Sequence, residues 1–238
     1  MTMTMGEISE LLRSTLGLTE PPVQISYLDE EPKDIASYAG TVPSGCTYWS
    51  AGTVGAFYAR LADHFNCEIG AYVLGTKPEG ELGGRLMETV GLMEKEGYLA
   101  KGEAFSIPRF ETAPRFVCYG PLGSMRYAPD AVVMFVEPSA AMLCLESAEK
   151  GGAHPYHVPV TGRPTCSLIP HLLNNGENAG MSFGCSGFRT FVENAKGKVL
   201  FAVRGKSLHD FADRLKRTAG ANRLTELRNL EKKKEICG

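Results

Sequence analysis

Four cysteines recur in two similar arrangements along this chain. Cys46 and Cys67 lie 21 positions apart, and Cys166 and Cys185 lie 19 positions apart. Cys46 and Cys166 each stand at a predicted helix start, whereas Cys67 and Cys185 lie beside glycine at the ends of predicted strands. A helix N-terminus lowers the pKa of a thiol because partial positive charge gathers there. Four soft sulfur ligands would select an iron–sulfur cluster, zinc or copper(I) rather than magnesium or calcium.

Two other interpretations of these cysteines stay open. The sequence contains no Cys-x-x-Cys motif, so four ligands would have to converge through the fold. A single buried cysteine can also be no more than a small apolar side chain. Alternatively, one thiol is a nucleophile, His64 takes its proton, and Asp63 or Asn66 orients the imidazole ring.

Three residues close to the first cysteine pair are candidates for ligand binding. Trp49 lies about one helical turn beyond Cys46 and either lines the same cleft or belongs to the core. His64 and Asn66 come directly before the second cysteine of the pair. Asn66 could instead fix its own backbone at a turn. We expect all three at the rim of a site that the cysteines form.

Arg189 is the fourth candidate for ligand binding. It follows residues 184–187, where two glycines permit backbone amides to converge on a ligand. Its guanidinium could clamp a carboxylate or phosphate with two parallel hydrogen bonds, or it could form a surface ion pair. This residue supports an alternative to metal binding, in which the chain binds or modifies a small anionic molecule without a metal.

The composition is that of an ordinary soluble globular chain. Its 238 residues are 43% hydrophobic and 22% charged, which indicates neither disorder nor a fibre. No apolar run approaches the roughly 20 residues that span a bilayer, and residues 1–6 do not resemble a signal peptide. We therefore expect a cytoplasmic protein with no membrane partner. Seven cysteines in a reducing compartment do not suggest a disulfide framework, so thiol or metal chemistry becomes the question.

The charges are distributed unevenly along the chain. Residues 1–195 carry 13 Lys and Arg against 22 Asp and Glu, whereas residues 196–238 carry 12 against 5. A basic tail is compatible with nucleic acid or an anionic surface. Here the basic residues alternate with acidic ones on sequence that predicts helix, and no aromatic platform accompanies them. The tail therefore predicts a solvated helical surface with no nucleic-acid partner.

Helices and strands alternate in the predicted secondary structure. A capping box of Thr4 and Glu7 opens an amphipathic helix that ends at Gly17. Strands are predicted at residues 23–28, 56–60, 71–75, 116–119, 131–136, 180–185 and 198–203. Further helices are predicted at residues 46–52, 86–99, 166–173, 207–215 and 224–234, while residues 140–146 fit either element.

The order of strand, loop, cysteine at a helix start, and strand ending in cysteine occurs twice. We interpret this as an internal duplication, with a first half at residues 1–115 and a second at residues 116–238. The predicted fold is α+β, with mixed sheets and flanking helices, and the two halves are related by a pseudo-twofold axis. A cleft between two such halves is a favoured place for a small ligand.

The chain also resembles a known family over nearly its whole length, the domain-of-unknown-function family with the number 169. The matching segments are Pro21-Pro22-Val23, Cys46-Thr-Tyr-Trp49, Asp63-His64-Phe65-Asn66-Cys67, Tyr119-Gly-Pro-Leu122, Pro129-Asp-Ala-Val-Val and Gly184-Cys185-Ser-Gly187-Phe-Arg189. The resemblance supports this choice of residues and implies no particular activity.

Two classes of function therefore follow from the sequence. In the first, Cys46, Cys67, Cys166 and Cys185 hold an iron–sulfur cluster or another soft metal between the two halves, for redox or sensory work. In the second, the chain is a metal-free module for a small anionic molecule, with or without a cysteine nucleophile. The expected partner is a small molecule or an electron-transfer protein, and a homodimer is one arrangement that the sequence allows. The sequence leaves open whether the protein is an enzyme.

Overall fold

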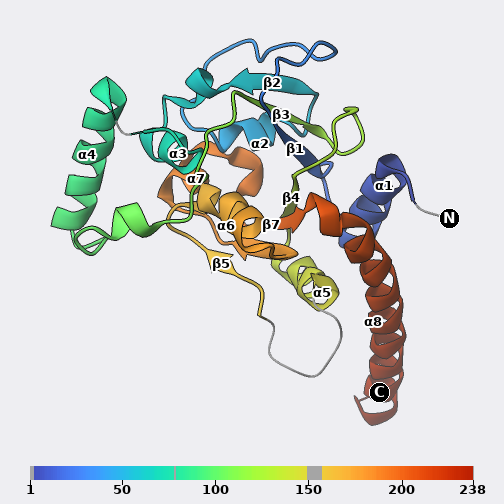
Figure 1. Cartoon of the computed structure of the whole chain (residues 1–238). Helices are drawn as coiled ribbons and strands as arrows, with labels where there is room; N and C mark the ends of the chain where they lie inside the picture. The colour runs from blue at the N-terminus through green and yellow to red at the C-terminus, as the bar shows by residue number, and fades with distance from the viewer. Residues whose placement is uncertain (1–2, 78, 149–156, 238) are drawn as a thin grey trace.

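The fold is a mixed α+β arrangement built on one seven-stranded sheet (Figure 1). The computed structural model describes residues 3–77, 79–148 and 157–237. The strands are β1 (Val23–Leu28), β2 (Phe57–Arg60), β3 (Phe116–Pro121), β4 (Ala131–Val136), β5 (Val160–Thr161), β6 (Ala179–Ser182) and β7 (Val199–Arg204). Their order is β2-β3-β1-β4-β7-β6-β5. Only the pairing of β5 with β6 is parallel among these described strands. The predicted α+β class is confirmed.

The strand order is similar on the two sides of the central β1–β4 pair. Going outward, β1 is followed by β3 and β2, and β4 is followed by β7 and β6, with antiparallel pairing at each step. β3 follows the predicted boundary at residue 115 but lies between β1 and β2 in the sheet. Internal duplication and the boundary between the halves stay predictions.

Alternate side chains of β4 enter two different apolar clusters. Ala131, Val133 and Phe135 belong to one cluster, and the residues between them belong to the other. Since successive side chains of a strand point to opposite faces of a sheet, the clusters lie on opposite faces. The sheet is therefore covered on both sides, and the elements that cover the two sides differ in length and regularity.

The first cover, which we call the helix face, consists of three regular helices. They are α1 (Met5–Leu16), α5 (Pro138–Ala148) and α8 (Leu208–Cys237). The predicted capping box of α1 is present: the Glu7 amide donates to Thr4 Oγ1 at 3.2 Å, and the Thr4 amide donates to Glu7 Oε2 at 2.7 Å. Residues 140–146, which fit helix or strand, form part of α5.

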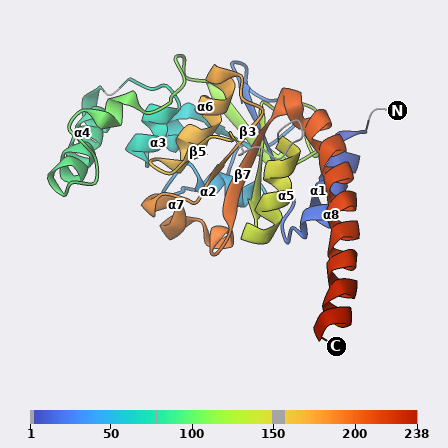
Figure 2. The same ribbon diagram turned by 90° about the horizontal axis from the view of Figure 1, so that it is seen from below.

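The two predicted C-terminal helices are one continuous helix, α8. Gly220 lies between them, but a glycine inside a helix costs only about 1 kcal/mol, and no proline follows to break the hydrogen bonding. The N-terminal part of α8 packs on the sheet through Leu208, Phe211 and Leu215. Its C-terminal part is exposed and projects from the body in Figures 1 and 2.

The second cover, which we call the cavity face, consists of short helices and 3-10 turns. The helices are α2 (Thr47–Ala51), α3 (Glu68–Val73), α6 (Leu168–Asn175) and α7 (Ser186–Phe191). The strand predicted at residues 71–75 is wrong, because those residues continue α3 and the turn after it. The Ala71 amide donates to the Cys67 carbonyl at 2.8 Å, and a short apolar run does not distinguish strand from helix by its periodicity.

Helix α4 (Gly80–Lys95) stands apart from the sheet in both views (Figures 1 and 2). It is followed by the 3-10 turn η2 (Glu103–Ser106). A small apolar cluster that includes Tyr72 of α3 and Val90 of α4 joins this arm to the body. The sequence predicts this helix at residues 86–99, whereas α4 runs from Gly80 to Lys95, so it begins and ends earlier than predicted.

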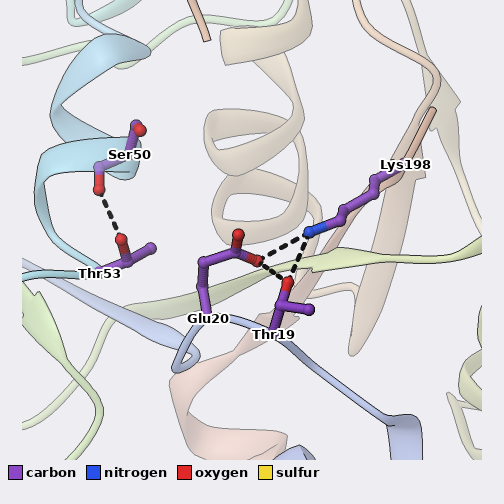
Figure 3. Close-up of polar contacts among 5 residues, drawn as sticks. All are labelled: Thr19, Glu20, Ser50, Thr53 and Lys198. Carbon is purple, nitrogen blue, oxygen red and sulfur yellow. Dashed lines mark hydrogen bonds and ion pairs between the residues drawn. The ribbon is translucent and has the colours of Figure 1, made fainter. Parts of the chain in front are cut away.

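An ion pair joins the start of β7 to the segment between α1 and β1 (Figure 3). Lys198 Nζ donates to Glu20 Oε2 at 2.8 Å and to Thr19 Oγ1 at 2.7 Å. Burial by itself would raise the pKa of Glu20, but the hydrogen bonds from Lys198 and Thr19 outweigh it, so the pKa is lowered. Figure 3 also shows the turn that follows α2, where the Thr53 hydroxyl donates to the Ser50 carbonyl at 2.8 Å.

No helix in the described ranges combines the length and the apolar character that a membrane crossing needs.

Candidate functional site

All four predicted cysteines line one cavity of about 570 Å³ on the cavity face. Cys46 precedes α2, Cys67 precedes α3, Cys185 precedes α7, and Cys166 lies in the 3-10 turn η3 (Thr165–Ser167) before α6. Each thiol thus stands at or near the start of a short helix. The two cysteine pairs, which come from distant parts of the sequence, meet at a single site.

The first pair, Cys46 and Cys67, is held by contacts with residues close to it in the sequence. Ser44 Oγ lies 3.0 Å from Cys46 Sγ, and the Gly70 amide donates to Cys67 Sγ at 3.3 Å. A Cβ at Gly70 would lie only 3.1 Å from that sulfur. Asn66 Nδ2 donates to the Val42 carbonyl at 3.0 Å, which ties the segment before Cys46 to the turn before Cys67.

The second pair is held in a comparable way. The Cys185 amide donates to Thr165 Oγ1 at 2.5 Å, so the residue next to Cys166 fixes the position of Cys185. Gly184 has a φ of 89°, and a Cβ there would lie 2.6 Å from the Phe188 ring. A non-glycine residue at 184 would therefore disturb the turn that aims Cys185 at the cavity.

The thiols lie close enough to influence one another electrostatically. Burial raises the pKa of Cys46 to about 12, and the neighbouring Cys67 and Cys185 add to the increase. Burial is the main cause that raises the pKa of Cys166, and the neighbouring Cys67, Cys46 and Cys185 raise it further. Burial also raises the pKa of Cys67. The sequence predicts lowered thiol pKa values for Cys46 and Cys166 at helix starts. That expectation is wrong for both thiols, because desolvation outweighs the positive end of a short helix.

The spacing of the cysteines has a bearing on what they could hold. Within residues 3–77, 79–148 and 157–237, no three His, Cys, Asp or Glu side chains stand close enough together to hold a metal ion. A tetrahedral ion with Zn–S bonds of about 2.3 Å would bring its sulfurs within about 4 Å of each other. A cluster places iron atoms between its cysteine ligands and accommodates sulfurs that are farther apart.

His64 lines the cavity but is buried and engaged on both ring nitrogens. Nδ1 lies 2.9 Å from the Arg60 carbonyl oxygen, which assigns the proton to Nδ1, and Nε2 then accepts from the Tyr119 hydroxyl at 3.0 Å. Burial lowers the pKa of His64 to about 4. The imidazole is therefore neutral at pH 7 and is hydrogen-bonded to groups other than a thiol.

The other predicted ligand-binding residues have different positions. Trp49 lines the cavity, but it is only 4% exposed and packs against Phe188, with ring centres 6.1 Å apart. Asn66 lines the cavity as well, and its amide is used for the Val42 contact. Arg189 is exposed, is absent from the described cavity wall, and donates to the Gly184 carbonyl at 3.0 Å.

The remaining cysteines lie elsewhere. Cys144 is buried in the cluster of the helix face, Cys118 is buried in a separate small cluster, and Cys237 is exposed near the end of α8. All seven cysteines are free thiols. The four cysteines that line the cavity are therefore separate in the structure from the other three.

Sequence reasoning missed most of the cavity wall. The missing side chains come from α4, from the segment around η2 and from the loop before η3; they include Leu86, Val90, Tyr98, Phe105 and Arg163. The apolar face of α4 was visible as a helical repeat. Nothing in that repeat indicated that its partner would be a cavity beside the cysteines.

Comparison with known proteins gives one family and one relative. The model of the DUF169 family, described as "Uncharacterised ArCR", matches residues 11–214, a span that contains all four cavity cysteines. The uncharacterized protein MJ0308 of Methanocaldococcus jannaschii is 26% identical over 162 residues, which cover 66% of this chain and 68% of that protein. No solved structure matches the chain.

Proposed function

The chain belongs to the DUF169 family, and we propose that it holds an iron–sulfur cluster, or another soft metal centre, for redox or sensory work. The ligands are Cys46, Cys67, Cys166 and Cys185. The observation that carries this proposal is their convergence: four thiols from two distant stretches of sequence line one cavity. Soft sulfur ligands of this number suit iron–sulfur clusters, zinc or copper(I).

A cluster held by these four thiols would place several metal atoms between its ligands. The cavity that the thiols line has a volume of about 570 Å³. The raised thiol pKa values mean that protons leave when the metal binds, so occupancy should increase with pH. If three cysteines suffice as ligands, one iron atom stays open toward the cavity and a small molecule can reach it.

The metal-free alternative receives less support from the cavity. A nucleophilic cysteine needs a nearby base, but the His64 ring nitrogens are engaged with Arg60 and Tyr119. The cation predicted for an anionic ligand, Arg189, is not among the described residues that line the cavity. Arg163 does line the cavity, but its guanidinium lies over the Tyr98 ring.

A cytoplasmic location belongs to the same proposal as the cluster, since thiols stay reduced there. The partner would be a small molecule or an electron-transfer protein.

The test is chemical analysis of the wild-type protein purified without oxygen. We expect stoichiometric iron and acid-labile sulfide, together with broad visible absorption that weakens on reduction with dithionite. Stoichiometric zinc without sulfide would mean that the cysteines bind a single ion and not a cluster. A protein with no stoichiometric metal would overturn the proposal and favour the metal-free module.

A further inference from the structure

We propose that the part of the cavity beneath α4 binds a neutral, apolar molecule that contains a flat ring. This inference names a ligand class for the same cavity, and it rests on the proposed function only in placing that ligand beside the four thiols. It follows from three features of the described cavity wall: an apolar interior, an aromatic mouth and the absence of a net charge.

The interior wall is apolar and comes from the arm that stands away from the sheet. Leu86 and Val90 of α4 are each 3% exposed, and both line the cavity together with Ala104 of η2. They also form a separate cluster with Tyr72 of α3. The arm thus contributes one wall of a pocket in addition to packing on the body. A volume of about 570 Å³ lies within the range of roughly 300–1,000 Å³ that is typical of sites for small organic ligands.

Three large aromatic side chains line the cavity although they remain accessible to solvent. Tyr98, Phe105 and Phe191 are 39%, 44% and 41% exposed. They come from the turn after α4, from η2 and from the end of α7. Exposed aromatic side chains that gather at a concave site mark a place where a ligand can cover them. Their rings offer edge-to-face or offset stacking to a flat ligand.

The charged groups of the cavity wall are one carboxylate and one guanidinium, and each makes a contact within the protein. Glu68 Oε1 accepts a hydrogen bond from Thr89 Oγ1 at 2.6 Å. Arg163 donates to the Tyr98 carbonyl oxygen, and its guanidinium carbon lies 4.4 Å from the centre of the Tyr98 ring. These are the charged residues of the described cavity wall, apart from the neutral His64, and their opposite charges leave the wall with no net charge. A charged ligand would therefore lose its hydration without a net counter-charge to replace it.

The test uses two fluorescent dyes that differ mainly in charge. Phenylnaphthylamine is neutral, and anilinonaphthalene sulfonate carries the same rings with an added sulfonate. We expect saturable binding of the neutral dye to the wild-type protein with one site per chain, and at least tenfold weaker binding of the sulfonated dye. Tighter binding of the sulfonated dye, or no saturable binding of the neutral dye, would contradict the inference.

A matched pair of variants on α4 locates the dye. Val90→Trp places a large side chain in the cavity and should weaken binding of the neutral dye at least tenfold. Leu92→Trp adds the same side chain at a position that is 59% exposed and should leave dye affinity within about twofold. Equal effects of the two substitutions would show that the dye binds elsewhere.

A third variant covers the case in which Val90→Trp does not fold. Phe191→Ala removes an exposed aromatic ring and should weaken binding of the neutral dye about twofold to tenfold, since one aromatic contact is worth about 0.5–1.5 kcal/mol. An unchanged affinity would count against the aromatic mouth. Metal content is measured in the same wild-type sample. Dye binding without metal would sink the proposed function alone, and metal without dye binding would sink this inference alone.

Discussion

The two faces of the sheet are covered in different ways. The helix face is covered by α1, α5 and α8, whose buried residues pack tightly on β4 and β7. The cavity face is covered by short helices that begin at cysteines and leave a cavity of about 570 Å³. Both faces carry a large buried apolar cluster, so both contribute to stability. The cavity face differs because short helices bring chain turns and four thiols together around a cavity, and it therefore carries the candidate site.

The largest effect on stability is expected from a substitution on the helix face. Phe211 is 1% exposed and stacks on Phe201 with ring centres 5.9 Å apart. Phe211→Ala should lower the free energy of unfolding by about 3–5 kcal/mol, because it leaves a cavity in a close-packed core. Denaturant unfolding measures this change. If the variant lost bound metal while keeping its stability, the division of roles between the faces would be wrong.

A somewhat smaller effect should appear on the cavity face when the pH falls. Burial holds the pKa of His64 at about 4 in the folded state, below its ordinary value of 6.5. The neutral ring stabilises the fold fully above pH 6.5, and this contribution is lost as the pH falls toward 4. Acidification over this range should cost about 3 kcal/mol, at 1.36 kcal/mol per pKa unit.

His64→Gln removes the titrating group and provides the comparison. The variant should show a flatter loss of stability between pH 6.5 and 4 when urea unfolding is followed at several pH values. The same slope in both proteins would mean that the histidine is not buried in its neutral form.

The smallest effect is expected from the ion pair in Figure 3. Lys198 and Glu20 have side chains that are 13% and 26% exposed. Lys198→Met should cost about 1 kcal/mol at pH 7. The pKa of Glu20 is lowered, so the cost should be present above pH 4.5 and disappear as the pH falls through the lowered value.

A neighbouring lysine offers a matched control for that substitution. Lys196 pairs with Glu193 at 3.3 Å, but their side chains are 69% and 86% exposed. Lys196→Met should therefore change the free energy of unfolding by close to zero. Equal effects of the two substitutions at pH 7 would indicate that burial of the Lys198 pair does not matter.

The sequence predicts secondary structure well where a short segment contains all the signals for its own helix or strand. The apolar run of β4 lies between Pro129 and Pro138, and the capping box of α1 specifies its own start. The four cysteines that recur in the sequence line one cavity in the structure. Their roles as metal ligands stay a prediction.

The rest depends on contacts between distant residues. Residues 71–75 were predicted as a strand because an apolar run of five residues fits either element. The cavity wall from α4 depends on its packing against α3 and η2, and no local pattern encodes that packing. The raised thiol pKa values follow from burial, which only the assembled fold establishes.

The central claim is tested most directly by the iron and sulfide content of three variants purified without oxygen. Cys67→Ala and Cys185→Ala each remove one thiol from the cavity, and Cys144→Ala removes a buried thiol from the helix face. We predict that the two cavity variants lose most of the iron and sulfide of the wild-type protein, whereas Cys144→Ala retains them. Equal content in all three variants, or none in the wild-type protein, would contradict the account.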